Sequence, residues 1–245
     1  MICMQKRKVK IKGYVTGIDQ IDQSWKGLKD GELYCFCCTS HVDKHDLLAK
    51  VVIGLASREM SVVVFTLDCS HRDMYRRLIK VIQDFDTSLS GCDSSQRVFE
   101  ANEKFGSYAI WIQDVPSLSY ETLSDRLQSL SYLNKHAVEC IVIDNILGME
   151  TDFQTPSREM TLEANLYLVK MIAKEYKIPI IVSTNYDKIS LDSILESDHI
   201  DKTMIVKTTD DSVDDALNTL CSTITVPKSN LASNLFESVL SVVVA

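Results

Sequence analysis

The chain has 245 residues, a net charge of -8 and 45% hydrophobic residues, which suits one large α/β domain with a substantial core. Its acidic balance argues against a broad nucleic-acid or anionic-membrane surface. No apolar run approaches the roughly 18 residues of a membrane span, and nothing at the start resembles a signal peptide, so we expect a cytoplasmic protein. The eight cysteines lie mostly in apolar runs, as reduced buried thiols do in cytosolic proteins.

The first third of the chain predicts a basic tail followed by a strand, a loop and a helix. Residues 1–12 are basic and predict an exposed tail or linker, which leaves residues 13–245 as a single domain. The first core strand is predicted at Leu33–Cys38, before a polar loop that runs to Lys44. The thiols of Cys35 and Cys37 alternate along this strand, so we expect both to face one side and to pack in the core. The apolar face of the following helix consists of Leu47, Leu48, Val51, Val52 and Leu55.

Later segments alternate apolar strands with amphipathic helices. The predicted strands lie at 61–67, 109–112, 140–144 and 178–185, and the predicted helices at 70–83, 119–133 and 159–176. Residues 84–106 are polar and turn-rich without a clear period, and residues 145–158 predict a loop. Short hairpin-like strands follow at 203–207, 222–226 and 238–245. The alternation predicts an α/β fold, a mainly parallel sheet flanked by helices, with antiparallel strands at its C-terminal edge.

Polar residues end three of these strands. Asp68, Asp144 and Asn185 follow buried apolar runs, and ligands of such sheets bind at the carboxyl ends of the strands. We therefore expect the three side chains to share one edge with the loop at 39–44. At each position taken alone, an acid that merely ends a strand is the alternative interpretation.

The loop itself has the architecture of a phosphate-binding loop but departs from its motif, Gly-x-x-x-x-Gly-Lys-Ser/Thr. Lys44 is retained, whereas Cys38 and Asp43 replace the glycines and His45 replaces the hydroxyl residue. At about 4 Å and an effective dielectric near 20, the Asp43 carboxylate would oppose a phosphate by about 4 kcal/mol, or about a thousandfold in affinity. Imidazole is also a poor ligand for Mg²⁺.

Two other site chemistries are weaker interpretations. Cys38, His41 and His45 have partial metal-ligand character, but the loop precedes the helix and no fourth ligand is evident, so we expect unligated side chains. A nucleophilic site could be assembled from residues 70–73, Ser-His-Arg-Asp, but this pattern is more typical of a helix cap and first turn.

Taken together, these segments resemble the C-terminal domain of DnaB-family replicative helicases, in the RecA-like ATPase superfamily. Thr16–Asp19 resembles the family's entry segment, and Phe65–Asp68 resembles its strand that ends in a general-base glutamate. Ile143–Asp144 is similar to the strand that ends in the magnesium-associated aspartate, and Asn185 aligns with a phosphate-sensing glutamine. The resemblance implies a RecA-like fold that uses ATP and Mg²⁺.

The resemblance also implies roles for individual residues. Nucleotide would contact Ser40, Lys44, His45 and Lys228, Mg²⁺ would bind Asp144, and Asp68 and Asn185 would act in catalysis. Asn230 stands where the family has an arginine that reaches the neighbouring subunit's nucleotide. The segment 186–201, which faces single-stranded DNA in the family, here has five acids against Lys188, so we do not expect DNA binding.

The sequence departs from the family's pattern both in the nucleotide-binding loop and in the segment that faces DNA. These departures favour a catalytically weak or inactive relative, a binding or assembly module related to DNA replication. The alternative is an active ATP-dependent DNA helicase domain with a divergent loop, supported by the retained Lys44, Asp68, Asp144 and Asn185. Expected partners are further copies of the chain or a DnaB-type helicase, without a membrane.

Overall fold

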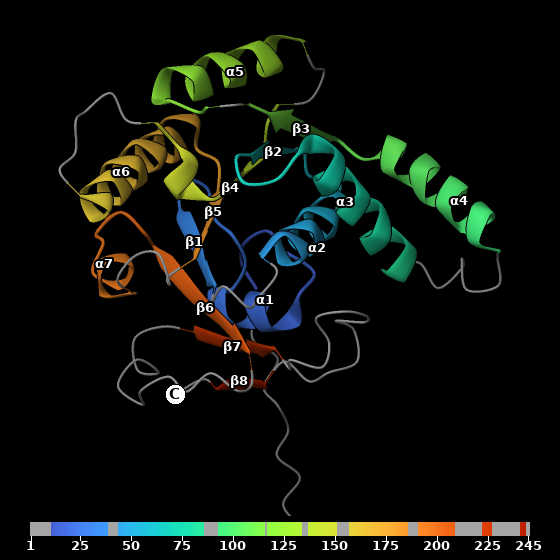
Figure 1. Ribbon diagram of the computed structural model, residues 1–245, viewed down its shortest axis with the longest axis horizontal. Helices are drawn as coiled ribbons and strands as arrows, with labels where there is room; N and C mark the ends of the chain where they lie inside the picture. The colour runs from blue at the N-terminus through green and yellow to red at the C-terminus, as the bar shows by residue number, and fades with distance from the viewer. Residues whose placement is uncertain are drawn as a thin grey trace, which may run out of the picture.

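Strand β1 (Leu33–Cys38) lies inside an eight-stranded sheet whose order is β3-β2-β4-β5-β1-β6-β7-β8 (Figure 1). The other strands are β2 Val62–Thr66, β3 Ile110–Asp114, β4 Cys140–Asp144, β5 Ile180–Asn185, β6 Lys202–Thr208, β7 Ser222–Val226 and β8 Ser241–Val243. The computed structural model describes residues 11–38, 44–85, 93–115, 117–133, 137–150, 157–185, 191–208, 222–226 and 241–243.

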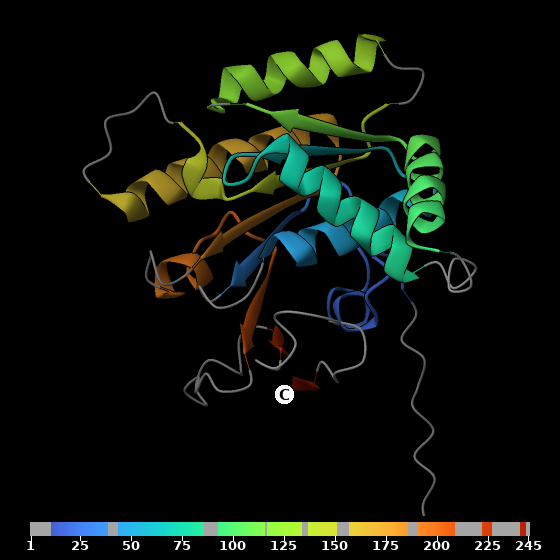
Figure 2. The same ribbon diagram turned by 45° about the vertical axis from the view of Figure 1, so that its right-hand side comes forward.

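Helices cover both faces of the sheet (Figures 1 and 2). They are α1 Asp19–Trp25, α2 Lys44–Ala56, α3 His71–Phe85, α4 Ser94–Ser107, α5 Tyr120–Leu133, α6 Arg158–Tyr176 and α7 Leu191–Leu195, with a 3₁₀ turn at Ile146–Gly148. No helix in the described segments is long and apolar enough to cross a lipid bilayer.

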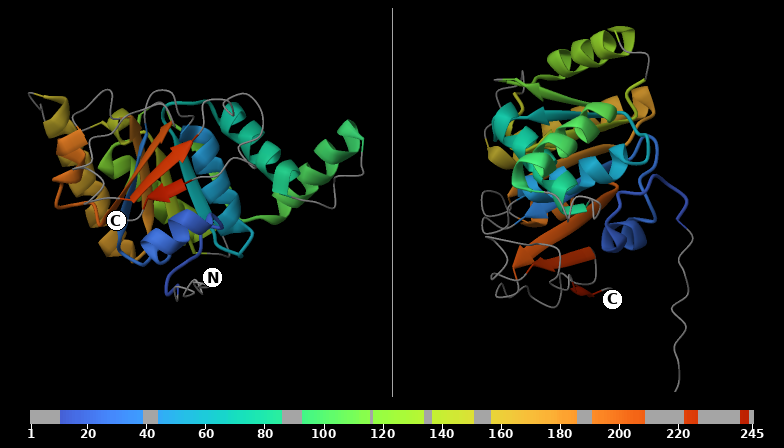
Figure 3. Two further views of the ribbon diagram at one scale, coloured as in Figure 1. Left: turned by 90° about the horizontal axis from the view of Figure 1, so that it is seen from below. Right: turned by 90° about the vertical axis from the view of Figure 1, so that its right-hand side faces the viewer.

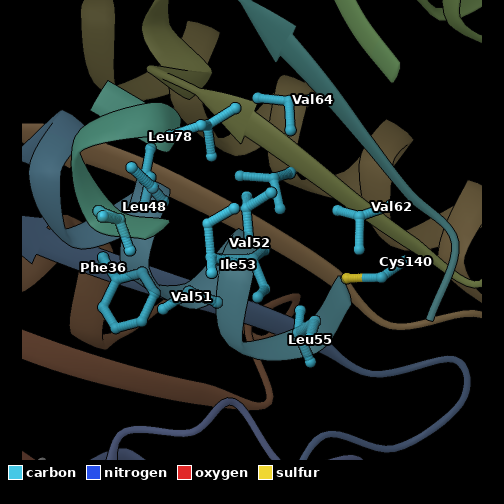
Figure 4. Close-up of a cluster of buried hydrophobic side chains, with 14 of the residues drawn as sticks. Phe36, Leu48, Val51, Val52, Ile53, Leu55, Val62, Val64, Leu78 and Cys140 are labelled. Atoms are coloured by element: carbon cyan, nitrogen blue, oxygen red, sulfur yellow. The ribbon is translucent and has the colours of Figure 1, made fainter. Parts of the chain in front are cut away.

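Two hydrophobic clusters, one on each face, hold the layers together. Alternation along β1 directs Tyr34, Phe36 and Cys38 to the face covered by α2 and α3, where Leu48 and Leu78 pack (Figure 4). The thiols of Cys35 and Cys37 lie in the opposite cluster, together with apolar residues of α5 and α6. The prediction that these two cysteines share one side of the strand and pack in the core is therefore confirmed.

The described pairs from β3 to β7 are all parallel. The prediction of hairpin-like antiparallel strands at the C-terminal edge was therefore wrong for the pair of β6 and β7, which is parallel. The three-residue β8 pairs antiparallel with β7. Short strands separated by polar loops do not reveal which neighbour they pair with, because the pairing is set by the path of the connection.

Helix α4 lies largely within residues 84–106, where the polar, turn-rich sequence predicts neither a helix nor a strand. Asp93 caps it by accepting a hydrogen bond from the Gln96 amide at 2.8 Å. Within this helix Ala101 is buried while Phe99 is 65% exposed, so an apolar period is hardly present in the sequence. The helix lies beside α3 at one margin of the molecule (Figure 3), where Phe105 meets Tyr75 edge to face at 5.0 Å.

The segment before β1 is fixed by a buried carboxylate and by close packing against α2. Asp22 accepts hydrogen bonds from the Thr16 amide at 2.7 Å, the Thr16 hydroxyl at 2.8 Å and the Gly17 amide at 3.0 Å. Gly54 of α2 faces the same turn, and a Cβ placed there would lie 1.7 Å from the Thr16 carbonyl oxygen. Helix α2 and the entry segment can therefore approach this closely only because residue 54 is glycine.

Two glycine-to-alanine substitutions should have opposite effects. Gly54→Ala should lower the free energy of unfolding by at least about 1–3 kcal/mol, since its methyl group would overlap backbone atoms. Gly106→Ala, near the end of α4, meets no atom within 4 Å and should raise it by about 0.5–1 kcal/mol. Urea unfolding of both variants against the parent measures this, and equal effects would show that α2 and the entry segment are not in contact.

Candidate functional site

The parallel sheet brings three charged side chains together at the carboxyl ends of its strands. Lys44 is the first residue of α2, Asp68 follows β2, and Asp144 ends β4. The neighbouring strands β2 and β4 pair with Thr66 opposite Asp144, so the chain just beyond β2 passes beside that carboxylate. The Lys44 ammonium lies 2.5 Å from Asp68 Oδ2 and 3.3 Å from Asp144 Oδ1.

Burial makes this arrangement strongly electrostatic. The side chain of Lys44 is 4% exposed and that of Asp144 is fully buried, whereas Asp68 is 36% exposed. A buried ion is tolerated only when it is paired and hydrogen-bonded, so Lys44 and Asp144 depend on each other. Two carboxylates flank one ammonium, and a negatively charged phosphate would compete with both of them for Lys44.

His45 completes the contacts of Asp144. Its Nε2 lies 2.9 Å from Asp144 Oδ2, while Ser183 donates to Oδ1 at 3.5 Å. Burial by itself raises the pKa of the Asp144 carboxyl, but the hydrogen bond with His45 and the charge of Lys44 outweigh it, so the pKa is lowered. Asp144 is therefore an anion whose two oxygens both have partners within the protein.

These residues do not fit the magnesium that the family's chemistry implies. Mg²⁺ requires about six oxygen ligands in near-octahedral geometry. Among the described residues, the possible ligand atoms beside Asp144 are a His45 nitrogen at 2.9 Å, the Ser183 hydroxyl oxygen at 3.5 Å and, within 4.8 Å, the sulfur of Cys69. The position at which a hydroxyl oxygen would be expected instead has an imidazole, so we derive no reaction step through Mg²⁺ here.

Asn185, the third predicted strand-end residue, lies on β5 directly opposite Cys38 in the parallel register. Its Oδ1 is buried and has no hydrogen-bond partner among the described residues. The remaining predicted site residues, including the loop positions, are Ser40, His41, Asp43, Lys228 and Asn230; they lie outside the described residues.

Cys69 is the site residue that the sequence reasoning missed. It directly follows Asp68, is half-buried, and is close to His45 and Asp144. The alternative metal set had joined His45 to Cys38, but Cys38 is buried in the cluster beneath α2. The sequence does show that Cys69 lies just past the end of β2. This indicates a place near Asp144 only once β2 and β4 are known to be neighbours.

The segment at 70–73 is a helix cap. The Ser70 hydroxyl donates to Asp73 Oδ2 at 2.7 Å, and the Asp73 amide donates to Ser70 Oγ at 3.1 Å. The His71 amide donates to Asp114 Oδ2 at 3.0 Å, which fixes the start of α3 against the end of β3. The helix-cap interpretation is confirmed, since the Ser70 side chain accepts a hydrogen bond from an amide of the first turn of α3 and itself donates to the Asp73 carboxylate.

The described part of the acidic segment, 191–201, is less uniformly repulsive than its sequence suggests. Asp192, Glu196 and Asp198 are exposed acids. Asp201 instead forms an ion pair with Lys170 of α6 and accepts a hydrogen bond from the Leu33 amide at 2.6 Å. Asp201 therefore joins α6 to the start of β1, and the three exposed acids contribute negative charge to the surface.

The strand order, with a lysine opening α2, an acid just past β2 and an acid ending β4, defines a RecA-like α/β domain. The chain belongs to the family of DnaB-like helicase C-terminal domains, whose model matches residues 13–188. The resemblance drawn from the sequence is thereby confirmed.

Individual relatives are distant. The replicative DNA helicase DnaB of Mycoplasma pneumoniae is 22% identical over 191 residues, which cover 73% of this chain and 40% of that protein. The chain therefore spans two-fifths of the length of this curated relative. A solved ATPase domain has a TM-score of 0.64 at 15% identity, covering 72% of this chain and 64% of that one. A DnaB-like replicative helicase, solved in a study of its interactions with primase, has a TM-score of 0.65 at 14% identity, covering 81% and 48%.

Replacing Lys44 should affect stability much more than replacing its exposed partner. Lys44→Met leaves the fully buried Asp144 without its cation and should lower the free energy of unfolding by about 2–4 kcal/mol. Asp68→Asn, at a 36% exposed position, should lower it by at most about 1 kcal/mol. Urea denaturation measures both, and equal losses would contradict the unequal dependence inferred here.

The lowered pKa of Asp144 predicts an acid-dependent loss of stability. Because the folded-state pKa is below the ordinary value of 3.8, the carboxylate's contribution is fully present above pH 3.8 and is lost as pH falls through the lower folded-state value. The stability difference between the parent and Asp144→Asn should therefore shrink as the pH is lowered below 3.8. Urea melts in chelator-containing buffer measure it; a difference that grows with acid would reverse the sign of the argument.

Proposed function

We propose that this chain is a cytoplasmic DnaB-type domain that has lost efficient ATP turnover and acts as a binding or assembly module related to DNA replication. In this proposal residues 1–12 are a basic tail and residues 13–245 a single domain. The observation that supports it best is the Lys44 ammonium, 4% exposed and paired with two carboxylates at 2.5 and 3.3 Å. A triphosphate would have to displace at least one of these carboxylates to reach the lysine.

The neighbouring positions strengthen the proposal. Asp43 adds a negative charge where the motif has glycine, and His45 replaces the hydroxyl residue. The His45 ring instead pairs with Asp144, the residue that would otherwise bind the metal ion. A weak nucleotide site would leave association as the main activity, with further copies of this chain or a DnaB-type helicase as partners. The exposed acids of 191–198 weigh against single-stranded DNA as a ligand.

A second candidate, an active ATP-dependent helicase domain with a divergent loop, is favoured by a different observation. Lys44, Asp68 and Asp144 converge at one strand-end edge, as the nucleotide site of a RecA-like ATPase requires. The buried Oδ1 of Asn185, next to the strand that enters the loop, is also compatible with a polar ligand. Under this candidate the lysine exchanges its carboxylates for phosphate when ATP binds.

Thermal melting separates the two candidates. A competent site exposed to ATP and Mg²⁺ at about 100 times its Kd gains about 2.7 kcal/mol, or about 5–10 °C in Tm for a domain of this size. We expect no such rise for the parent at millimolar ATP and Mg²⁺. We expect a saturable rise for the double variant Asp43→Gly, His45→Thr, which restores the Gly-Lys-Thr sequence.

The control is Lys44→Ala in the repaired background, which should remove the rise relative to its own nucleotide-free Tm. ATP hydrolysis is measured in parallel by phosphate release, with and without single-stranded DNA. A saturable Tm rise and Lys44-dependent phosphate release by the parent would establish the helicase candidate instead.

A further inference from the structure

His45, Cys69 and Asp144 form a compact set of three different ligand types. His45 comes from the first turn of α2, Cys69 from the chain just past β2, and Asp144 from the end of β4. Their ligand atoms all lie within 4.8 Å of one another, and His45 Nε2 is 2.9 Å from Asp144 Oδ2. The His45 and Cys69 side chains are half-buried, while Asp144 is fully buried.

We propose that these three residues bind a thiophilic divalent cation, Zn²⁺ in particular. Zn²⁺ bonds thiolate sulfur at about 2.3 Å, imidazole nitrogen at about 2.0–2.1 Å and carboxylate oxygen at about 2.0–2.2 Å. In a tetrahedral site these bond lengths place the ligand atoms about 3.2–3.7 Å apart. The three groups are therefore within about 1–2 Å of ligating geometry, a shift that side-chain torsions provide.

The nature of the donors selects against Mg²⁺. A nitrogen, a sulfur and a single carboxylate suit a borderline-soft ion, whereas Mg²⁺ requires oxygen ligands. The described residues supply three ligands, which leaves a fourth tetrahedral position for water or for an exogenous group. The same substitution that removes the Mg²⁺ hydroxyl ligand, His45 in place of Ser or Thr, thus supplies a zinc ligand.

The surroundings hold the carboxylate in place and balance the charge. Lys44 and Ser183 contact Oδ1 of Asp144, so that Oδ2 faces His45 and the proposed ion. Such contacts to a ligating carboxylate orient it and tune its affinity. Binding releases the Cys69 thiol proton to solvent, and the resulting thiolate and the Asp144 carboxylate together offset the charge of Zn²⁺. Lys44 remains neutralised by Asp68.

This inference goes beyond the proposed function, because it needs neither the presence nor the loss of ATP turnover. The test uses the full chain, reduced and stripped with a chelator, in nucleotide-free buffer. Zn²⁺ alone is titrated in competition with a chromophoric chelator, and Co²⁺ alone is titrated while its absorption spectrum is recorded. We expect one saturable site and a Co²⁺ spectrum with tetrahedral d–d bands and a thiolate charge-transfer band.

Three variants remove one ligand each, and a fourth is the matched control. Cys69→Ser, His45→Gln and Asp144→Asn should each weaken Zn²⁺ affinity at least tenfold, and Cys69→Ser should also abolish the charge-transfer band. Cys140→Ala, which replaces a buried cysteine at the other end of β4 from Asp144, should leave affinity and spectrum unchanged. Circular dichroism checks folding, and if Asp144→Asn unfolds, the spectrum of Cys69→Ser decides.

Two results would overturn the site. One is the absence of saturable binding by the parent. The other is binding that all three ligand variants retain at the parent's affinity, which would place the ion on other thiols. Neither result bears on the ATP melts, so failure of the zinc site and failure of the proposed function are distinguishable.

Discussion

The ion pairing of one buried lysine is the constraint on which the strand-end edge of this protein depends. Lys44 lies at the start of α2, where the apolar face of that helix packs against the sheet and places the ammonium at the ends of β2 and β4. Asp144 ends a strand whose residues are all buried, so its charge would be untenable without a nearby cation. Helix α2, strand β2 and strand β4 are therefore coupled by these ion pairs as well as through the core. A substitution at one of the three charged residues alters the electrostatic environment of the other two.

This coupling gives Lys44 a role that does not depend on a match between the loop and a phosphate-binding motif. In an intact motif, Lys44 would be retained because it contacts phosphate. Here it also neutralises a buried carboxylate, a role that does not require nucleotide binding. The presence of Lys44 and Asp144 is thus weaker support for ATP hydrolysis than the sequence alone suggests, because their buried ion pair also has a structural role.

Much of the fold could be predicted because its strands are continuous apolar runs bounded by polar residues. The bounds of β1, β4 and β7 match the predicted ones, as each run ends at a charged or turn-forming neighbour. Helix α4 could not be predicted from periodicity, since its one buried residue, Ala101, leaves no apolar stripe. The parallel pairing of β6 with β7 was missed for another reason: local sequence contains no information on the path by which the chain returns to the sheet.

The candidate site, like the fold, could be predicted only in part from the sequence. Asp68 and Asp144 were identifiable because parallel strands present their carboxyl ends at one edge. Cys69 required the spatial order of the strands, as its proximity to His45 exists only because β2 and β4 are neighbours with Thr66 opposite Asp144. The position of His45 therefore matters for more than the absence of a hydroxyl group. A ring that packed away from the sheet would mark simple decay of the motif, whereas this ring lies 2.9 Å from a buried carboxylate and close to a thiol. At this position the chain therefore places an imidazole nitrogen beside Asp144, with a thiol nearby, where the motif has a hydroxyl oxygen.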